Sequence, residues 1–485
     1  MTVTATRMEQ WTWPPAYDDD YRPADDATHW FPVRETMAPD RRDELLLARI
    51  QEVMAYAWST SPFYRAKWGA AGLEPGDVRT LEDFERVPVV HKDELRADQA
   101  EHEPYGSYLC VPPRDVRHVN GTSGTTGRPT AFGVNGRDWR SIANAHARVM
   151  WAMGIRPSDT VLIGSPLSLY WGSWGAYIGA ERLGATVFPF GAGTAGQSLR
   201  TVHWMRQMGV TVFYGTPSYA LHLAEVARDA GIDPRHLGVR RMFFSGEPGA
   251  SVPSIRERIA TVFDTRVYDS GSMAEVSPWM HLGAGSDEPG VLCWQDLVHT
   301  DVCDPTTLRR LPYGSEGTPV YTTLERTAQP MIRLLSNDLT RWEAPSAERG
   351  RTYPFLPRGI YGRIDDMFVV RGENIYPSAI DEVVMRSDNY GGEHRIVISR
   401  DGAMDELVVQ VEHDGGLGGE GGLTQWCATI SGRLRTVLGV GAKVLPVAPQ
   451  TFARTEFKAR RVIDDRDLFR SLEASTAGAS TDGVS

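Results

Sequence analysis

Short apolar runs alternate with amphipathic helical patterns through the middle of the chain. The runs VLIG, ATVFPF, VTVFYG and RRMFFSG end at glycine or turn residues and predict strands. The segments between them carry apolar residues at helical spacing, as in Ser218–Ala230 and Ser254–Phe263. Strand–helix–strand alternation of this kind predicts an α/β fold with buried, largely parallel sheets flanked by helices.

The two ends of the chain read differently from the middle. Residues 1–40 are rich in Pro, Asp and Trp and predict an irregular arm, after which Glu44–Trp58 has the apolar spacing of an amphipathic helix. Beyond residue 362 the apolar runs become shorter strands, FVVRGENIYP, HRIVISRD and ELVVQVEHD. A glycine-rich loop at 415–422 then precedes a helix over Leu423–Val437.

This change of pattern divides the chain into two predicted domains. We expect a large N-terminal domain of packed sheets over residues 1–362 and a small, mobile α+β domain over residues 363–470. The last stretch, residues 471–485, is of low complexity and predicts a disordered tail.

Composition narrows the class of protein. Of the 485 residues 41% are hydrophobic, enough for a large core. Lys and Arg number 51 against 62 Asp and Glu, giving a net charge of −11, which argues against nucleic acid as the main partner. The chain shows neither an export signal nor an apolar stretch long enough for a membrane span.

The cysteines point to a reducing compartment and not to a metal centre. None of the four forms a C-x-x-C pair, so we expect reduced thiols and a cytoplasmic location. Cys293, His299 and Cys303 form the one Cys/His grouping. Because it lacks a fourth ligand, we do not expect zinc there.

The segment NGTSGTTGRPT, residues 120–130, is the most informative stretch of chemistry. Its three glycines and several hydroxyl side chains make a loop whose N–H groups can converge on phosphate, with Arg128 adding positive charge. It is not a Walker A loop, because five residues separate Gly121 from Gly127 and Arg-Pro follows the last glycine. We therefore predict a phosphate-binding loop of another kind.

A second glycine pattern, GAGTAG at residues 191–196, formally fits a dinucleotide-binding turn. Such a turn needs an acidic residue at the end of the next strand to hold the ribose, but VTVFYG ends in Tyr214 and Gly215. We therefore expect these glycines to shape a turn and not to bind NAD.

Two more segments follow predicted strands, SGEPG at 245–249 and YDSGSMAEVSP at 268–278. The carboxyl ends of parallel strands are where α/β proteins place ligands.

Seven segments of the chain, in their order and spacing, resemble motifs of the adenylate-forming superfamily of acyl-CoA synthetases and adenylation domains. They are TSGTTGRP, YGTPSY, SGEP, SMAE, IRLLSNDLTR, GRIDDM-x-x-VRGENIYP and EFKARRVID. The resemblance is greatest to the phenylacetate–CoA ligase group and covers roughly residues 40–465.

The resemblance implies roles for particular residues. It places ATP phosphates on the loop Thr122, Ser123, Gly124, Thr125, Thr126, Gly127 and Arg128. It places the adenine and ribose beside Ser245, Gly246, Glu247, Pro248, Asp269, Ser270, Asp338 and Arg363. Glu275 is implied to bind Mg²⁺, and Lys458 to bridge the acid and the α-phosphate. Arg363, implied to contact the ribose or a phosphate, is expected to be catalytic together with Glu275 and Lys458. Asp365 is implied to be the hinge between the two domains.

The segment YWGSWGAYIGAERLGATVFP, residues 170–189, resembles the aryl-acid pocket of that group. The predicted substrate residues are Tyr170, Trp171, Trp174, Gly175, Tyr214 and Gly215, with Tyr177 completing an aromatic wall. One departure concerns residues 271–274. The family's usual Tyr-Gly-x-Thr/Ser before the glutamate is replaced here by Gly-Ser-Met-Ala.

Three functions follow as hypotheses. The first is an ATP- and Mg²⁺-dependent ligase that adenylates an aromatic acid and transfers it to a thiol, with CoA as the expected acceptor. The second is a diazotase that adenylates nitrite, whose activated product then reacts with an arylamine to give a diazonium. The altered 271–274 segment would suit such a diversion. The third is a non-catalytic nucleotide-binding protein. None of the three hypotheses decides whether the chain forms a homodimer.

The chemistry explains why such residues would be needed. A carboxylate is a poor electrophile and has to be activated before a thiol can attack it. Its attack on the α-phosphorus of ATP expels pyrophosphate and gives an acyl-AMP, from which AMP can leave in the second step. Because two anions must meet, a divalent cation and a fixed cation such as Lys458 would lower the barrier.

Overall fold

The computed structural model describes residues 11–121, 130–191, 197–247, 250–276, 280–364, 366–371, 373–401, 404–453 and 461–465. The chain divides into two compact units, Met1–Tyr361 and Gly362–Ser485. Within the described ranges, no helix combines the length and the apolarity needed to cross a bilayer.

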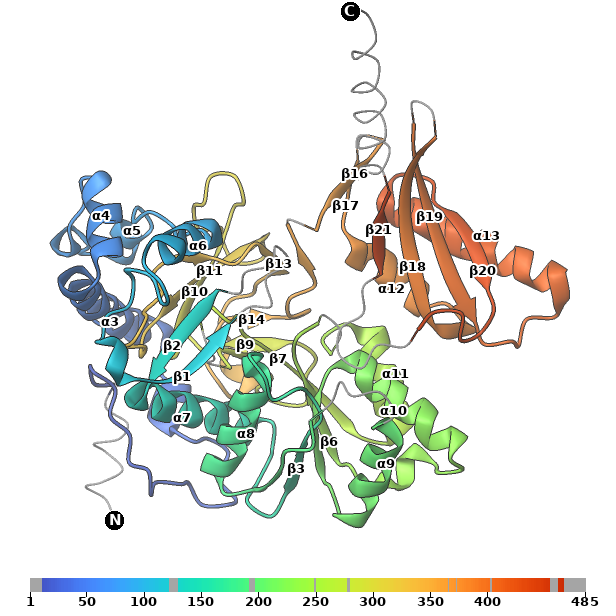
Figure 1. Ribbon diagram of the computed structural model, residues 1–485, viewed down its shortest axis with the longest axis horizontal. Coiled ribbons are helices and arrows are strands. Elements are labelled where there is room, and N and C mark those ends of the chain that lie inside the picture. The colour runs from blue at the N-terminus through green and yellow to red at the C-terminus, as the bar shows by residue number, and fades with distance from the viewer. Residues whose placement is uncertain are drawn as a thin grey trace, which may run out of the picture. The chain divides into compact units, whose positions relative to one another are not determined.

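The first unit is built on an eight-stranded sheet with the order β14-β9-β8-β7-β6-β5-β3-β4 (Figure 1). Its strands are β3 (Thr160–Ile163), β4 (Thr186–Phe188), β5 (Val212–Gly215), β6 (Arg241–Phe244), β7 (Arg266–Gly271), β8 (Leu282–Gly283), β9 (Val291–Cys293) and β14 (Phe355–Leu356). The pairs from β4 to β7 are parallel, and those from β7 to β14 are antiparallel. The predicted α/β class is confirmed, and the four predicted strands are β3, β4, β5 and β6, which together with β7 form the parallel part of the sheet.

Five helices pack in two groups, and four of them, α8 to α11, connect the parallel strands (Figure 1). The first group is α7 (Gly136–Ala152) with α8 (Trp171–Leu183), and the second is α9 (Ser198–Gln207), α10 (Pro217–Asp229) and α11 (Pro253–Phe263). A Cβ at Gly175 or Gly179 would lie within 2.4 Å of His146 in α7. Glycine at these two positions therefore lets α7 and α8 approach closely.

The remainder of the first unit contains smaller sheets and the N-terminal helices. Strand β11 (Glu316–Thr323) pairs with β10 (Val298–Cys303), β12 (Leu334–Leu335) and β13 (Asp338–Arg341), and β1 (Val116–Gly121) pairs with β2 (Ala131–Asn135). The helices are α2 (Pro32–Glu35), α3 (Pro39–Thr60), α4 (Pro62–Ala70), α5 (Leu81–Phe84) and α6 (Lys92–Glu101). One apolar core joins these elements to the eight-stranded sheet.

The second unit has a core of its own. A four-stranded sheet in the order β20-β19-β18-β21 and a hairpin of β16 and β17 pack with two helices. The elements are β15 (Gly362–Arg363), β16 (Phe368–Val370), β17 (Glu373–Ile375), α12 (Pro377–Met385), β18 (Tyr390–Asp401), β19 (Met404–His413), α13 (Gly419–Leu438), β20 (Lys443–Val447) and β21 (Val462–Asp464).

Two helices begin earlier than the sequence pattern predicts. Helix α3 begins at Pro39. Proline is favoured at the first position of a helix, because its φ angle is fixed near the helical value. Helix α13 begins at Gly419, inside the segment predicted to be a loop. Its buried stripe of Trp426, Ile430 and Leu434 stabilises the helix by packing, which outweighs the low helix propensity of glycine.

Candidate active site

The predicted site segments gather at one edge of the eight-stranded sheet. Strands β3, β5, β6 and β7 are adjacent and parallel, so their carboxyl ends lie side by side. Gly215 is the last residue of β5 and Ser270 lies near the end of β7, whereas Tyr170 and Ser245 lie in the segments that follow β3 and β6. This is the edge at which open α/β sheets bind ligands.

Three hydroxyl groups meet there, and we call them the hydroxyl cluster: Tyr170, Tyr214 and Ser245. The Ser245 Oγ lies 2.9 Å from the Tyr170 Oη and 2.5 Å from the Tyr214 Oη, and the two phenol oxygens are 3.4 Å apart. Burial raises the pKa of both tyrosines above its ordinary value, so both phenols stay protonated. The cluster therefore offers neutral donors and acceptors to a bound molecule.

The start of helix α8 is shaped around this cluster. A Cβ at Gly172 would lie 2.3 Å from the Tyr214 Oη and 2.4 Å from the Tyr170 Oη. Glycine is therefore required for the hydroxyl cluster to pack on the first turn of the helix. The amino end of α8 also carries partial positive charge, which suits a carboxylate nearby.

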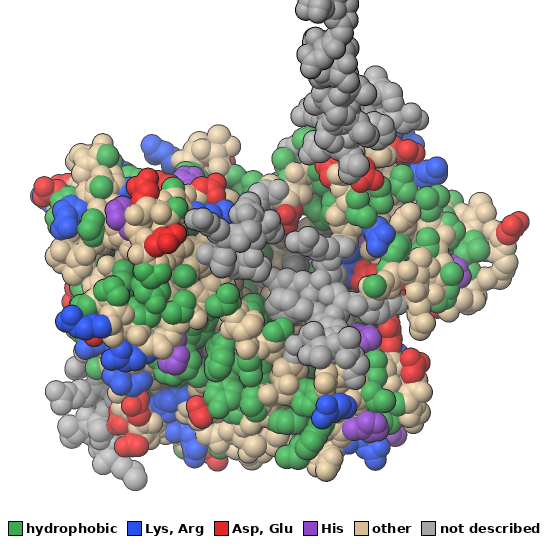
Figure 2. Space-filling model, viewed as in Figure 1, with side chains coloured by type: hydrophobic (Ala, Val, Ile, Leu, Met, Phe, Trp, Pro, Cys, Tyr) green, Lys and Arg blue, Asp and Glu red, His purple; other side chains and the backbone are tan. Residues whose placement is uncertain are grey.

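The other predicted substrate residues take part in packing. Trp171 is 5% exposed and lies against Trp139, while the Trp174 Nε1 donates to the Ser168 carbonyl at 2.9 Å. Gly175 faces His146, Gly215 lies against the Phe213 ring, and Tyr177 meets Trp174 edge to face. Apolar side chains also gather on the surface over β1, β2 and α8, where Val119 and Leu169 are each 47% exposed (Figure 2).

The residues expected beside adenine have local partners. Gly246 has φ +93°, a conformation that favours glycine, and the Glu247 carboxylate accepts a 2.7 Å hydrogen bond from the Ser218 N–H at the start of α10. The Asp269 carboxylate accepts from the Ser251 Oγ at 2.5 Å, and the Ser270 Oγ donates to the Phe244 carbonyl at 2.8 Å. Burial raises the pKa of Asp269 to about 6.

Glu275, predicted to bind the metal, lies in a loop held from three sides. The Lys92 Nζ in α6 lies 3.6 Å from the Glu275 Oε1, and the Arg326 Nη1 donates to the Glu275 backbone carbonyl at 2.5 Å. The Asn120 Nδ2 donates to the Ala274 carbonyl at 3.2 Å. Neither Lys92 nor Arg326 is predicted from the sequence, because a lysine at a helix start and an arginine in a loop are most often ordinary surface residues.

The carboxylate of Glu275 is a ligand of the kind that Mg²⁺ prefers. Among the residues that the structure describes, no three His, Cys, Asp or Glu side chains converge, so Glu275 is one carboxylate without a protein cage. Mg²⁺ characteristically takes one or two protein carboxylates and completes its shell with substrate phosphates and water. A single buried carboxylate such as that of Glu275 is compatible with this way of binding.

Asp338 and Arg363 lie at the ends of short strands. Asp338 begins β13, and its N–H donates to the Ser336 Oγ at 3.0 Å. In the second unit, the Arg363 Nε lies 3.9 Å from the Asp366 Oδ2. The remaining predicted site residues lie outside the described residues: Thr122, Ser123, Gly124, Thr125, Thr126, Gly127, Arg128, Pro248, Asp365 and Lys458.

In the grouping of Cys293, His299 and Cys303, both ring nitrogens of the histidine lie within hydrogen-bonding distance of other side chains. The His299 Nδ1 lies 3.1 Å from the Gln295 Oε1, and its Nε2 lies 3.1 Å from the Asp301 Oδ2. Burial raises the pKa of both thiols, that of Cys303 to about 12, which keeps them protonated. The histidine is thus part of a hydrogen-bonded pair with Asp301.

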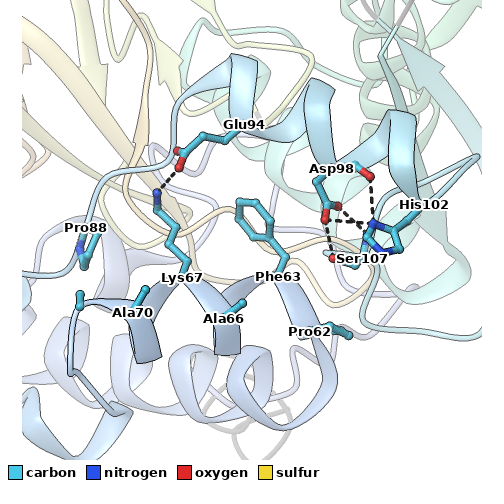
Figure 3. Close-up of a pocket in the computed structure, with 11 residues that line it drawn as sticks. Pro62, Phe63, Ala66, Lys67, Ala70, Pro88, Glu94, Asp98, His102 and Ser107 are labelled. Carbon is cyan, nitrogen blue, oxygen red and sulfur yellow. Dashed lines mark hydrogen bonds and ion pairs between the residues drawn. The ribbon is translucent and has the colours of Figure 1, made fainter.

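A separate open groove of about 720 Å³ lies between α4 and α6 (Figure 3). It contains Ser107, Asp98 and His102, the residue types of a hydrolase triad. However, the Ser107 Oγ donates to the Asp98 Oδ1 at 2.6 Å, so the aspartate, and not the histidine, receives the hydroxyl proton. This arrangement does not activate a serine nucleophile.

Comparison with known proteins places this site in a family. The chain matches the AMP-binding enzyme family over residues 70–321 and the AMP-binding enzyme C-terminal domain over residues 372–466. It is 32% identical to the phenylacetate-coenzyme A ligase of Pseudomonas putida over 89% of this chain and 96% of the relative. It is 31% identical to that of Escherichia coli K12 over 90% and 97%.

A solved structure is more similar still. The crystal structure of 2-hydroxyisobutyryl-CoA ligase, in the postadenylation state with 2-HIB-AMP, is 56% identical. It covers 97% of this chain and 99% of its own, with a TM-score of 0.92. This chain therefore belongs to the adenylate-forming superfamily, as an AMP-forming acid–CoA ligase of the branch that contains the phenylacetate–CoA ligases.

Proposed function

We propose that the enzyme activates a short 2-hydroxy carboxylic acid as its acyl-AMP and transfers the acyl group to CoA. The observation that carries this proposal is the 56% identity to a 2-hydroxyisobutyryl-CoA ligase over 97% of the chain, against 32% to a phenylacetate-coenzyme A ligase. The substrate class tends to follow the more similar relative, because the residues that line a pocket diverge with the rest of the chain.

The hydroxyl cluster supports a hydroxylated substrate. Tyr170, Tyr214 and Ser245 present polar groups where an aryl acid would need an apolar surface. A 2-hydroxy acid would exchange hydrogen bonds with these hydroxyl groups, whereas the analogue without the hydroxyl would gain none and would place an apolar group against them. The cluster would therefore select a hydroxy acid over the acid of the same shape that lacks the hydroxyl.

An aromatic acid is the second candidate. It is favoured by the phenylacetate-coenzyme A ligases among the relatives, and by Trp171 and Trp174 of α8 with Trp139 of α7. Planar side chains of this kind can enclose a planar substrate, although Trp171 is already buried in the core.

The residues would share the first half-reaction as follows. The 122–128 loop and Arg363 would hold the nucleotide, Asp338 its ribose, and Glu275 the Mg²⁺ that neutralises phosphate charge. Lys458 would stabilise the charge that develops as the acid attacks the α-phosphorus and pyrophosphate leaves. Asp365 would be the hinge that lets the second unit serve thioester formation afterwards.

Mass spectrometry of acyl-CoA products from ATP, Mg²⁺, CoA and a panel of acids tests the proposal. We expect 2-hydroxyisobutyrate to exceed isobutyrate in kcat/KM by about 10²-fold or more, and to exceed phenylacetate and benzoate. Preference for the aryl acids would establish the second candidate. AMP formation that requires nitrite and an arylamine, and not CoA, would establish a diazotase.

The variant Tyr214→Phe examines the recognition mechanism directly. It removes one hydroxyl of the cluster, so the preference for 2-hydroxyisobutyrate over isobutyrate should fall about tenfold. An unchanged ratio would show that the cluster does not contact the substrate hydroxyl.

A further inference from the structure

Glu275 and Lys92 form an ion pair between two distant parts of the chain. The Lys92 Nζ lies 3.6 Å from the Glu275 Oε1, and the two side chains are 18% and 6% exposed. Lys92 is the first residue of α6, whereas Glu275 lies in the loop after β7. A carboxylate buried this deeply is costly unless a positive charge lies beside it, and Lys92 supplies one.

The other contacts of this loop have a different role. Arg326 and Asn120 donate to the backbone carbonyls of Glu275 and Ala274, which fixes the path of the main chain. The charge of Arg326 is balanced chiefly by Asp138. The Lys92 ammonium is thus the cation directed at the Glu275 carboxylate itself.

We propose that Lys92 is the resident counter-cation of Glu275 and sets the affinity of this site for Mg²⁺. The inference rests on the proposed role of Glu275 as the metal ligand. A divalent cation on the carboxylate would meet the ammonium at close range, so the ion pair must open for the metal to bind. Lys92 is therefore a positioning residue that weakens metal binding.

This arrangement suits a two-step reaction. A Mg²⁺ held by Glu275 and by phosphate would lose part of its binding partners when pyrophosphate leaves after the first step. Lys92 would then supply the positive charge that the buried Glu275 carboxylate needs, and would hold the loop in place during thioester formation.

A binding titration tests the inference without any acid substrate. The purified full chain is held with α,β-methylene-ATP, which cannot form AMP, and MgCl₂ is titrated while the melting temperature is recorded. In Lys92→Gln the half-saturating Mg²⁺ concentration should fall roughly fivefold relative to wild type. An unchanged or higher value would overturn the proposal.

Lys67→Gln is the matched control. Lys67 also pairs with a carboxylate, its Nζ lying 2.5 Å from the Glu94 Oε1, but in the groove between α4 and α6 (Figure 3). Its loss should leave the half-saturating Mg²⁺ concentration unchanged. A fall as large as that of Lys92→Gln would mean that the effect is not specific to Glu275 and would overturn the proposal.

Two further variants separate the possible failures. Glu275→Gln should raise the half-saturating Mg²⁺ concentration, and an unchanged value would refute the metal role on which the inference rests. If Lys92→Gln does not fold, the double variant with Glu275→Gln should fold again, because no buried charge is then left alone. A double variant that stays unfolded would count against the pairing.

Discussion

The Arg148 Nε donates to the Glu35 Oε1 at 3.0 Å, joining residues 113 positions apart in a region with almost no solvent exposure. Glu35 also accepts from the Arg351 Nε at 2.8 Å and from the backbone N–H of Phe31 at 2.9 Å. One carboxylate thus ties the N-terminal arm to α7 and to the segment before β14. This contact makes the arm part of the core of the first unit.

Replacing Glu35 by Gln should destabilise the first unit. The amide keeps the shape but leaves Arg148 and Arg351 without this countercharge, which should lower the unfolding free energy by about 3 kcal/mol. Urea unfolding followed by tryptophan fluorescence measures the change. Glu44→Gln, which removes an exposed pair with Arg41, is the control and should stay within about 0.5 kcal/mol of wild type.

Alanine at Gly172 should impair the active site more than the fold. Its Cβ would push the phenol oxygens of Tyr170 and Tyr214 apart, so kcat/KM for the preferred acid should fall at least about tenfold. Gly136→Ala is the control, because a Cβ there meets nothing within 4 Å. Equal kcat/KM in both variants would show that the hydroxyl cluster tolerates displacement.

Asp269 should make the stability of the protein depend on pH. Its pKa is raised to about 6 by burial, so between about pH 4 and 6 the folded protein keeps a proton that the unfolded chain has lost. The contribution of Asp269 to stability is therefore full below about pH 4 and is lost as the pH rises through 6. Relative to Asp269→Asn, the wild-type unfolding free energy should fall by about 2 kcal/mol from pH 4 to 7. A difference that is constant or rises with pH would contradict the assigned direction.

Lys458→Ala should stop adenylation and leave ATP binding largely intact. The residue is proposed to act on charge that develops as the α-phosphorus is attacked, so pyrophosphate–ATP exchange should fall by about 10²-fold or more. Calorimetric titration with ATP checks binding. Lys443→Ala, an exposed lysine of β20, provides a control in the same unit. Loss of ATP binding in Lys458→Ala alone would reassign the residue to the nucleotide.

Much of the fold could be read from local pattern. The run VTVFYG became β5, and Ser218–Ala230 became α10 with little change of bounds, because buried parallel strands and amphipathic helices each have a distinctive spacing. Helix α13 could not be placed as well. Its first turn is glycine-rich, and only packing of residues further along stabilises it.

The sequence by itself determined the α/β class, the order of the motifs and the family, because hydrophobic spacing and motif order are properties of the chain read in one dimension. The tertiary structure alone brought Tyr170, Tyr214 and Ser245 into one cluster and set Lys92 against Glu275. These contacts join residues that are 31 positions apart in the chain, as for Tyr214 and Ser245, up to 183 positions apart, as for Lys92 and Glu275. Such proximity is decided by how strands and helices pack, which no local pattern records.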